Sequence, residues 1–460
     1  MSAVTDYIEA NREQFLAGLV ELLRIPSISA GTRNTGDVLR CAEWLAAHMR
    51  QVGLNNVQIL PTGGHPAIYA DWMDAPSGSS TVLVYGHYDV QPVDPLNEWE
   101  TEPFEPTVRD GRIFARGAAD DKGQVFMHRK AIEAYLQTGG RLPINLKLIV
   151  EGEEEIGSEH LDSFMQTYKD MLRADMVVVS DTSWFANDVP SLTYGLRGLT
   201  YLQVDLQGPP NDVHSGSYGG AVGNPIQALV QMLASLKDAD DHVTIAGFYD
   251  AVRPITPQEQ NAWDELPFNE QEYLAELGVP ELHGERGYSV LERLWARPTL
   301  EINGIWGGFT GEGSKTIIPA RASAKISCRL VADQDPEQII ALVEDHLRRI
   351  CPSWVTITIT RMGTGKASVT ELDSPGVQAA LRALERSFGK RAVFIRGGGS
   401  IPIVASFQDV LSLPAVLMGM ADADDHAHAP NERFGLDKFY GGITAAAYLW
   451  EELATGAPAD

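Results

Sequence analysis

The sequence predicts an α/β protein: a discontinuous domain with a mixed, mostly parallel sheet flanked by helices, and a smaller α+β two-layer domain inserted into it. Short apolar segments alternate with helical segments from the start of the chain to Asp181, which is typical of an α/β sheet. The pattern then changes, and it returns from Asp373-Ser374-Pro375 onward. We therefore expect 1–192 and 373–460 to form one domain and 193–372 to form the insertion.

Two amphipathic segments open the chain and predict helices. Apolar side chains between Ile8 and Leu23, and again between Val38 and Met49, lie mostly on one face with a period of 3.6 residues. Strands and helices alternate after them: strands are predicted at 57–60, 68–72, 81–85, 144–150 and 176–180, helices at 122–136 and 161–168, and a hairpin turn at 110–111. The fully apolar strands are typical of a sheet that helices cover on both faces.

The inserted segment has a different pattern. Residues 200–206 alternate as in a half-exposed strand, and Asn224-Pro225 is typical of a helix start, because asparagine caps and proline fits the first helical position. After a polar stretch, 249–298, the sequence predicts a strand at 322–330, a helix at 336–350 and a strand at 355–360. Three strands alternating with two helices predict a two-layer α+β domain.

Composition excludes several classes of protein. The chain has 460 residues, 44% hydrophobic, which is enough to bury a sizeable core. Lys and Arg number 36 against 62 Asp and Glu, and the net charge of −26 would repel nucleic acids and anionic membranes, so neither is expected as a partner. The three scattered cysteines suggest reduced thiols, and neither a signal peptide nor a long apolar run is present, so the expected location is cytoplasmic.

Histidines and carboxylates gather where predicted core strands end. His87 and Asp89 follow strand 81–85, the run Glu151–Glu155 follows strand 144–150, and Asp181 follows strand 176–180. The pair Asp120-Asp121 precedes a helix, and His428 follows a strand predicted at 415–419. Taken alone, most of these segments are explained as well by a helix cap or a surface loop. A solvated acidic run is the usual explanation for Glu151–Glu155, but its position between a buried strand and a helix, with flanking glycines, favours a cation site.

Most of these histidines and carboxylates follow the end of a predicted core strand, and this common position suggests that they form one site. The carboxyl ends of parallel strands meet at one edge of a sheet, so we expect the side chains to converge there. Imidazoles and carboxylates without a thiolate suit Zn²⁺, Mn²⁺ or Co²⁺, and two cations that share a bridging carboxylate can catalyse hydrolysis. The sequence therefore predicts a hydrolytic metal centre.

Eight segments together resemble the di-metal aminoacylase/carboxypeptidase G2-type exopeptidases, most closely their carnosinase-like cytosolic dipeptidase branch. They occur in the family's order and span the chain: YGHYDVQP (85–92), GAADDKG (117–123), EGEEEIGS (151–158), VVVSDT (177–182), NDVHSG (211–216), GSKTIIPA (313–320), RGGGSIP (396–402) and HAPNE (428–432). One position departs from the pattern, because Gly397 stands where this branch commonly has Glu.

The resemblance implies a role for each matching residue. It implies two divalent cations per chain, zinc first with manganese or cobalt as alternatives, bridged by Asp120 and held by His87, Asp120, Glu155, Asp181 and His428. Glu154 would be the general base and Asp89 would orient His87. The implied contacts with the substrate and the transition state are His214, Arg329, Ser400 and Thr316. The family also implies a cis peptide bond between Asp120 and Asp121.

The predicted function is that of a metallo-dipeptidase, which hydrolyses the peptide bond of dipeptides or short peptides with a di-metal-activated water. The alternative enzyme is an N-acyl amino acid amidohydrolase of the deacetylase or desuccinylase type; the stretch 249–298 resembles the longer insertion of the dipeptidase branch and favours the first prediction. A non-catalytic dimeric binding protein is the alternative of another class, which the complete set of ligands and Glu154 disfavours. The resemblance also implies that 193–372 is a lid and dimerisation domain, and that His214 serves the active site of a partner in a homodimer.

Overall fold

A computed structural model describes residues 1–399 and 401–455, in which the chain forms two compact units. Unit 1 consists of Met1–Tyr194, Thr370–Ile395 and Ile403–Asp460, and unit 2 consists of Gly195–Val369 and Arg396–Pro402. None of the helices in the described residues has the length and hydropathy needed to cross a bilayer.

Unit 1 opens with three helices, α1 (Ser2–Ala10), α2 (Arg12–Leu23) and α3 (Thr35–Val52). The single apolar face expected between Ile8 and Leu23 is divided by Asn11, which leaves helical geometry and donates its side-chain amide to the Tyr7 carbonyl at 2.8 Å. The α3 helix ends at Gly53, whose φ of 103° is a left-handed conformation that glycine adopts without strain.

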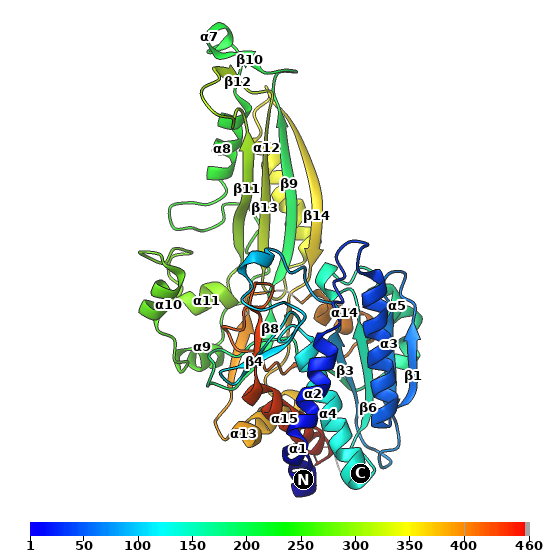
Figure 1. Ribbon diagram of the computed structural model, residues 1–460. Helices are drawn as coiled ribbons and strands as arrows, with labels where there is room; N and C mark the ends of the chain where they lie inside the picture. Colours follow the sequence, from blue (N-terminus) through cyan, green and yellow to red (C-terminus); the bar gives the residue numbers. More distant parts are fainter. Residues whose placement is uncertain (400, 456–460) are drawn as a thin grey trace. The chain divides into compact units, whose positions relative to one another are not determined.

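A mixed sheet forms the centre of unit 1 (Figure 1). Its strands follow the order β1 (Asn55–Leu60), β2 (Ala67–Trp72), β6 (Asn145–Glu151), β3 (Thr81–His87), β7 (Met176–Val179), β17 (Ala415–Leu417) and β8 (Ser191–Leu196), the last of which ends in unit 2. The mixed sheet confirms the predicted fold class. Parallel pairing joins β6 to β3, β3 to β7 and β7 to β17, and antiparallel pairing joins β1 to β2, β2 to β6 and β17 to β8. The carboxyl ends of β3, β6 and β7 therefore share one edge.

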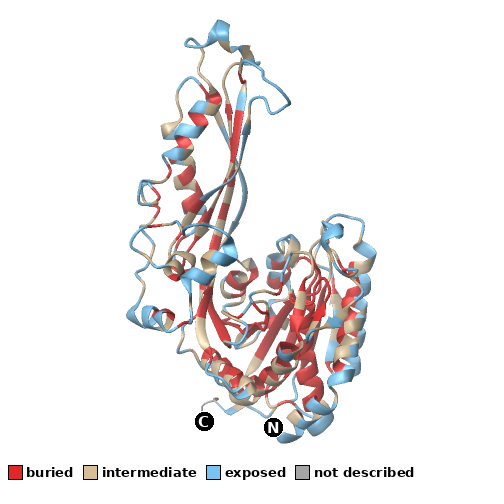
Figure 2. Ribbon diagram, turned by 60° about the vertical axis from the view of Figure 1, so that its left-hand side comes forward, coloured by how far each residue is buried: buried red, intermediate tan, exposed pale blue. Residues whose placement is uncertain are grey.

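Helices flank this sheet, and unit 1 also contains a separate three-stranded sheet. The helices after α3 are α4 (Lys122–Gly139), α5 (Leu161–Thr167), α6 (Lys169–Leu172), α13 (Pro375–Phe388), α14 (Pro402–Leu411) and α15 (Leu436–Thr455). The small sheet has the order β18 (Arg433–Gly435), β5 (Arg112–Phe114) and β4 (Thr107–Arg109). The predicted hairpin joins β4 and β5 through Asp110 and Gly111, which both have positive φ. Figure 2 shows how completely the central strands and the inner helix faces are buried.

Unit 2 is built on a four-stranded antiparallel sheet with helices α8 (Pro225–Ala234) and α12 (Pro336–Ile350). The strand order is β11 (Thr299–Gly307), β13 (Arg321–Leu330), β9 (Gly198–Gln207) and β14 (Thr356–Gly365). Alternate residues of β9 are buried, and they form a separate core with apolar residues of both helices. Asn224 caps α8 as predicted, with its side chain accepting from the Ile226 amide at 2.9 Å.

Two features of unit 2 differ from the sequence-based expectation. Strand β11 is a fourth strand that the sequence analysis missed, because it is an exposed edge strand whose pairing is irregular between Ile302 and Gly304. The polar stretch 249–298, in which the sequence analysis placed no helix or strand, contains α9 (Pro257–Asp264), α10 (Glu270–Leu277) and α11 (Val290–Trp295), each with a side-chain cap at its start.

A short segment from the C-terminal half also belongs to unit 2. The expected insertion, 193–372, does not include Arg396–Pro402, which begins within β16 (Val393–Gly397). Buried Arg396 forms an ion pair with Glu259 of α9, and Arg197 donates from Nε to the Gly398 carbonyl at 3.0 Å. These polar contacts hold the segment against unit 2.

Candidate metal centre

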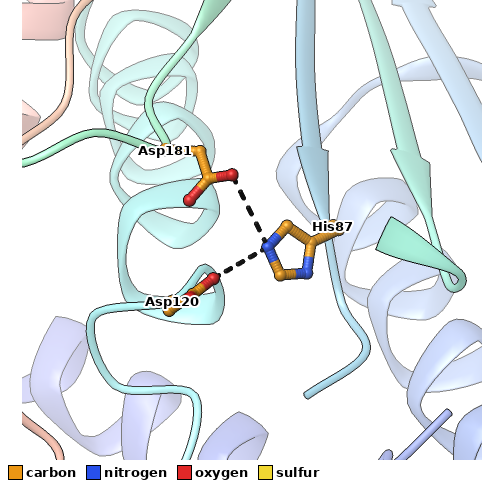
Figure 3. Close-up of side chains that lie close together, drawn as sticks. All are labelled: His87, Asp120 and Asp181. Carbon is orange, nitrogen blue, oxygen red and sulfur yellow. Dashed lines mark hydrogen bonds and ion pairs between the residues drawn. The ribbon is translucent and has the colours of Figure 1, made fainter. Parts of the chain in front are cut away.

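The imidazole of His87 lies fully buried at the carboxyl end of β3. Its Nδ1 faces Asp89, 3.1 Å from the backbone carbonyl and 3.4 Å from Oδ1. Its Nε2 faces the other way, 3.0 Å from Oδ1 of Asp120 and 3.8 Å from Oδ2 of Asp181 (Figure 3). These three residues form one group of metal-ligand type.

A second group shares Asp120 with the first. Oδ2 of Asp120 lies 2.8 Å from Nε2 of His428, and the same nitrogen lies 3.1 Å from Oε2 of Glu155. Each carboxylate oxygen of Asp120 therefore faces a different histidine. The five residues proposed from the sequence as ligands come together in unit 1, although they lie far apart along the chain.

Asp121 is the buried neighbour of Asp120 at the start of the next helix. The peptide bond between Asp120 and Asp121 is cis, as the family resemblance predicted. Asp121 follows at the start of α4, where its Oδ2 accepts from the His87 amide at 3.3 Å and its buried Oδ1 has no hydrogen-bond partner among the described residues.

Asp89 connects the loop of His87 to the loop of the acidic run. Its Oδ1 accepts from the Glu154 amide at 3.2 Å and its Oδ2 from the Glu155 amide at 3.1 Å. These amides belong to a short 3₁₀ helix, Glu154–Ile156, directly after β6. The buried Asp89 carboxylate therefore orients His87 and the backbone of the acidic run together.

Gln91 is a contact that the sequence analysis missed. Its side-chain amide donates to the backbone carbonyl of Glu155 at 3.1 Å and to Oε2 of the same residue at 2.7 Å. Gln91 follows Asp89 by two positions in an extended segment, and this spacing, which places alternate side chains on one face, was the available signal.

Glu154 has the electrostatic character of a proton acceptor. No hydrogen bond joins its carboxylate to another described residue. Burial raises the pKa of Glu154 to about 7; the charge of His87 opposes this shift, and the carboxylates of Asp120 and Glu155 add to it. A carboxylate whose pKa lies near neutrality can accept and return a proton efficiently.

The remaining charges show how the two groups could hold cations. Burial raises the pKa of Asp181 well above its usual value, with a further contribution from Asp120. Hydrogen bonds to Asp120 and then to Glu155 raise the pKa of His428 to about 10. Within the described part of the chain, no lysine or arginine pairs with Asp120, Asp181 or Glu155. Among the described residues, the side chains that can carry positive charge within ion-pair distance of these three carboxylates are the imidazoles of His87 and His428. This donor set fits hard or borderline divalent cations.

The other predicted site residues are not part of these groups. His214 is exposed in β10 (Val213–His214), and its Nδ1 accepts from the amides of Gly216 and Ser217 at 3.0 and 3.2 Å. Exposed Thr316 lies beside it, just before β12 (Ile317–Ile318), which pairs with β10. Arg329 lies half-buried in β13, where burial lowers its pKa.

All three belong to unit 2, and Ser400 lies outside the described residues. Their contacts with a substrate stay predictions.

A mixed α/β domain with paired imidazole and carboxylate groups at one sheet edge defines a metal-dependent hydrolase. Residues 83–452 match the model of Peptidase family M20/M25/M40, and the chain belongs to this family.

Relatives of known activity match almost the whole chain. It is 33% identical to the Cys-Gly metallodipeptidase dug1 of Schizosaccharomyces pombe, over 98% of both proteins. It is 32% identical to the human Beta-Ala-His dipeptidase, over 99% of this chain and 93% of the relative. The solved structure of the di-peptidase Dug1p from Saccharomyces cerevisiae matches with a TM-score of 0.86 and 31% identity, over 99% of both chains.

These similarities confirm the predicted family and its dipeptidase branch. They agree with the prediction of a metal-dependent hydrolase of dipeptides. Neither the N-acyl amino acid amidohydrolase nor the non-catalytic binding protein receives support from them.

Proposed function

We propose that this chain is a dipeptidase that works with two divalent cations. One cation would be held by His87, Asp120 and Asp181, and the other by Asp120, Glu155 and His428. The observation that carries the proposal is the position of Asp120, whose two oxygens face two different histidines, as a bridging ligand requires. Zinc is the first choice for this mixture of imidazoles and carboxylates, with manganese and cobalt as alternatives.

The chain's own residues would supply the proton transfers. Two bound cations would acidify the attacking water and polarise the substrate carbonyl. Glu154 would take a proton from the water as its oxygen forms a bond to the peptide carbon. It would then give that proton to the departing amine as the carbon–nitrogen bond breaks. The raised pKa of Glu154 supports both halves of this role.

The residues of unit 2 would recognise the substrate. Arg329 can pair with the carboxylate at the end of a dipeptide, because a guanidinium offers two parallel donors. His214 would stabilise the oxyanion of the transition state. Its Nδ1 accepts two backbone hydrogen bonds, so the proton is placed on Nε2, where it can be donated. Thr316 and Ser400 are further proposed contacts.

We also propose a homodimer formed through unit 2, in which His214 serves the partner's site. The edge strand β11 exposes Ile302, Ile305 and Trp306, and an exposed apolar sheet edge favours pairing with a second chain. The three free cysteines agree with the proposed cytoplasmic location.

The direct test compares substrates before and after metal removal. Protein treated with a chelator should lose activity on free dipeptides and regain it with Zn²⁺, Mn²⁺ or Co²⁺, with about two ions bound per chain by elemental analysis. N-acetyl and N-succinyl amino acids serve as competing substrates. Preferential hydrolysis of these compounds would overturn the dipeptidase proposal, and full activity with one ion would overturn the bridging role of Asp120.

A further inference from the structure

Glu432 is a fully buried carboxylate with four hydrogen-bond donors around it. Its Oε2 accepts from Nη1 of Arg116 at 2.7 Å and from the Gly117 amide at 3.0 Å. Its Oε1 accepts from the Ala119 amide at 3.0 Å and from the Asp120 amide at 3.2 Å. The side chain of Glu432 therefore binds the backbone of the loop that ends in Asp120.

The backbone of Glu432 approaches the same loop. Its carbonyl accepts from the Ala115 amide at 3.1 Å, next to the pairing of Arg433 with Phe114 between β18 and β5. Glu432 is also only four residues beyond His428. Side chain and backbone together thus connect the segment that carries His428 to the loop that carries Asp120.

Arg116 extends this connection to a third segment. Its side chain is 1% exposed, and its Nη2 donates to the Pro92 carbonyl at 3.0 Å. Pro92 follows Gln91, which holds Glu155. The pair of Arg116 and Glu432 therefore joins the three loops that bear His87, Asp120 and His428.

Only a carboxylate can fill this position. Four donors surround two oxygens, and an ionised carboxylate accepts at both oxygens while donating none. Glutamine would present an N–H group to donors at one of the two positions, and it would leave the buried charge of Arg116 without its counter-ion.

We propose that Glu432 is a positioning residue that fixes the Asp120 backbone relative to His428, so that the two oxygens of Asp120 face the two metal-binding groups. This inference rests on the proposed metal site at Asp120. Residues that orient metal ligands typically change metal affinity or activity by about 10–100-fold when they are substituted.

The experiment measures metal affinity in Glu432→Gln by competition with a chromophoric chelator, and the absorption spectrum of the Co²⁺-loaded protein. We expect the dissociation constant of the more weakly held ion to rise by about 10–100-fold, with a changed Co²⁺ spectrum. At saturating metal, kcat should fall while KM stays nearly constant.

A matched variant separates positioning from general stability. Glu133 is another buried carboxylate of unit 1, and it pairs with Lys130 at 2.8 Å on α4. Glu133→Gln should lower the melting temperature as a buried ion pair is broken, and it should leave the metal affinity and the Co²⁺ spectrum unchanged.

The outcomes distinguish this inference from the proposed function. A wild-type protein that binds no divalent cation would overturn the metal site itself. A wild-type protein with two ions, and a folded Glu432→Gln variant with the same affinities and Co²⁺ spectrum, would overturn only the positioning role. If Glu432→Gln does not fold, Arg116→Lys is measured instead; it keeps the charge but loses the planar fork that reaches both Glu432 and Pro92. We expect a smaller rise in the dissociation constant there, and unchanged metal binding would again reject the inference.

Discussion

The two units present their chemistry in opposite ways. In unit 1, His87, Asp89 and Asp120 lie buried or half-buried at strand and helix ends, and hydrogen bonds fix them before any ligand arrives. In unit 2, His214 and Thr316 are exposed on two short paired strands. The difference teaches that the proposed metal ligands are preorganised within unit 1, whereas the side chains of His214 and Thr316 lie exposed on the surface of unit 2.

The largest effect expected in this comparison comes from removing the carboxylate that both groups share. Asp120→Ala should lose both cations and all measurable activity, because each group would keep only one imidazole and one carboxylate. Elemental analysis after gel filtration measures the metal content, and circular dichroism checks the fold. Two ions retained by the variant would show that Asp120 does not bridge.

Substitutions of Glu154 and Glu155 test whether the first residue transfers protons and the second binds metal. Glu154→Gln should keep both ions while kcat falls by about 10²–10⁴, the usual contribution of a general acid–base residue. Its neighbour provides the matched comparison: Glu155→Gln should weaken metal binding, because Oε2 of Glu155 faces His428. Metal loss in the first variant and not in the second would mean that the two roles are exchanged.

The sequence predicted much of unit 1 because its signals are local. An apolar strand followed closely by a histidine or by carboxylates marks the segments of His87, of the run Glu151–Glu155 and of Asp181 without tertiary information, and the family resemblance then implies which of these residues are ligands. The same reasoning could not find Glu432, because its partners are backbone amides more than 300 positions away, and a backbone amide has no sequence signature.

Unit 2 was less predictable for a related reason. Strand β11 lies at an edge, so its residues are not buried in alternation and show no period of two. Its apolar residues that stay exposed, such as Ile305 and Trp306, resemble a loop with isolated hydrophobic positions. The helices of 249–298 are short and polar, and their caps are clearer in the structure than any periodicity in the sequence.

Exposed His214 of unit 2 provides a test of whether the two units act together in catalysis. His214→Ala should keep both ions and lose about 10²–10³ in rate, the usual cost of removing one oxyanion donor. Mixing this variant with Glu154→Ala under conditions of subunit exchange should restore activity, because a mixed dimer would contain one complete site. Mixed dimers without activity would show that His214 acts within its own chain or not at all.

The smallest effect concerns a polar contact inside unit 2. Glu285 accepts from Nε and Nη2 of Arg297, both at 2.7 Å, and from Nδ1 of His242 at 2.8 Å. Burial opposes ionisation, but the hydrogen bonds from Arg297 and then His242 prevail and lower the pKa of Glu285. Because the folded-state pKa is lower than the unfolded one, this stabilisation is complete above the unfolded pKa of about 4.3 and is lost as the pH falls through the folded pKa.

Glu285→Gln should therefore lower the free energy of unfolding by about 1.5–3 kcal/mol at pH 7, the usual contribution of hydrogen bonds to a charged group. The difference between wild type and variant should shrink as the pH falls through the folded pKa of Glu285, which urea titrations at several pH values would measure. Exposed Glu281→Gln is the control, with little change expected. Metal content and the Co²⁺ spectrum should be unaffected, because every proposed ligand lies in unit 1. A variant that lost metal as well as stability would show that the proposed ligands in unit 1 depend on unit 2 for their arrangement. The conclusion that unit 1 holds these ligands in place by itself would then be wrong.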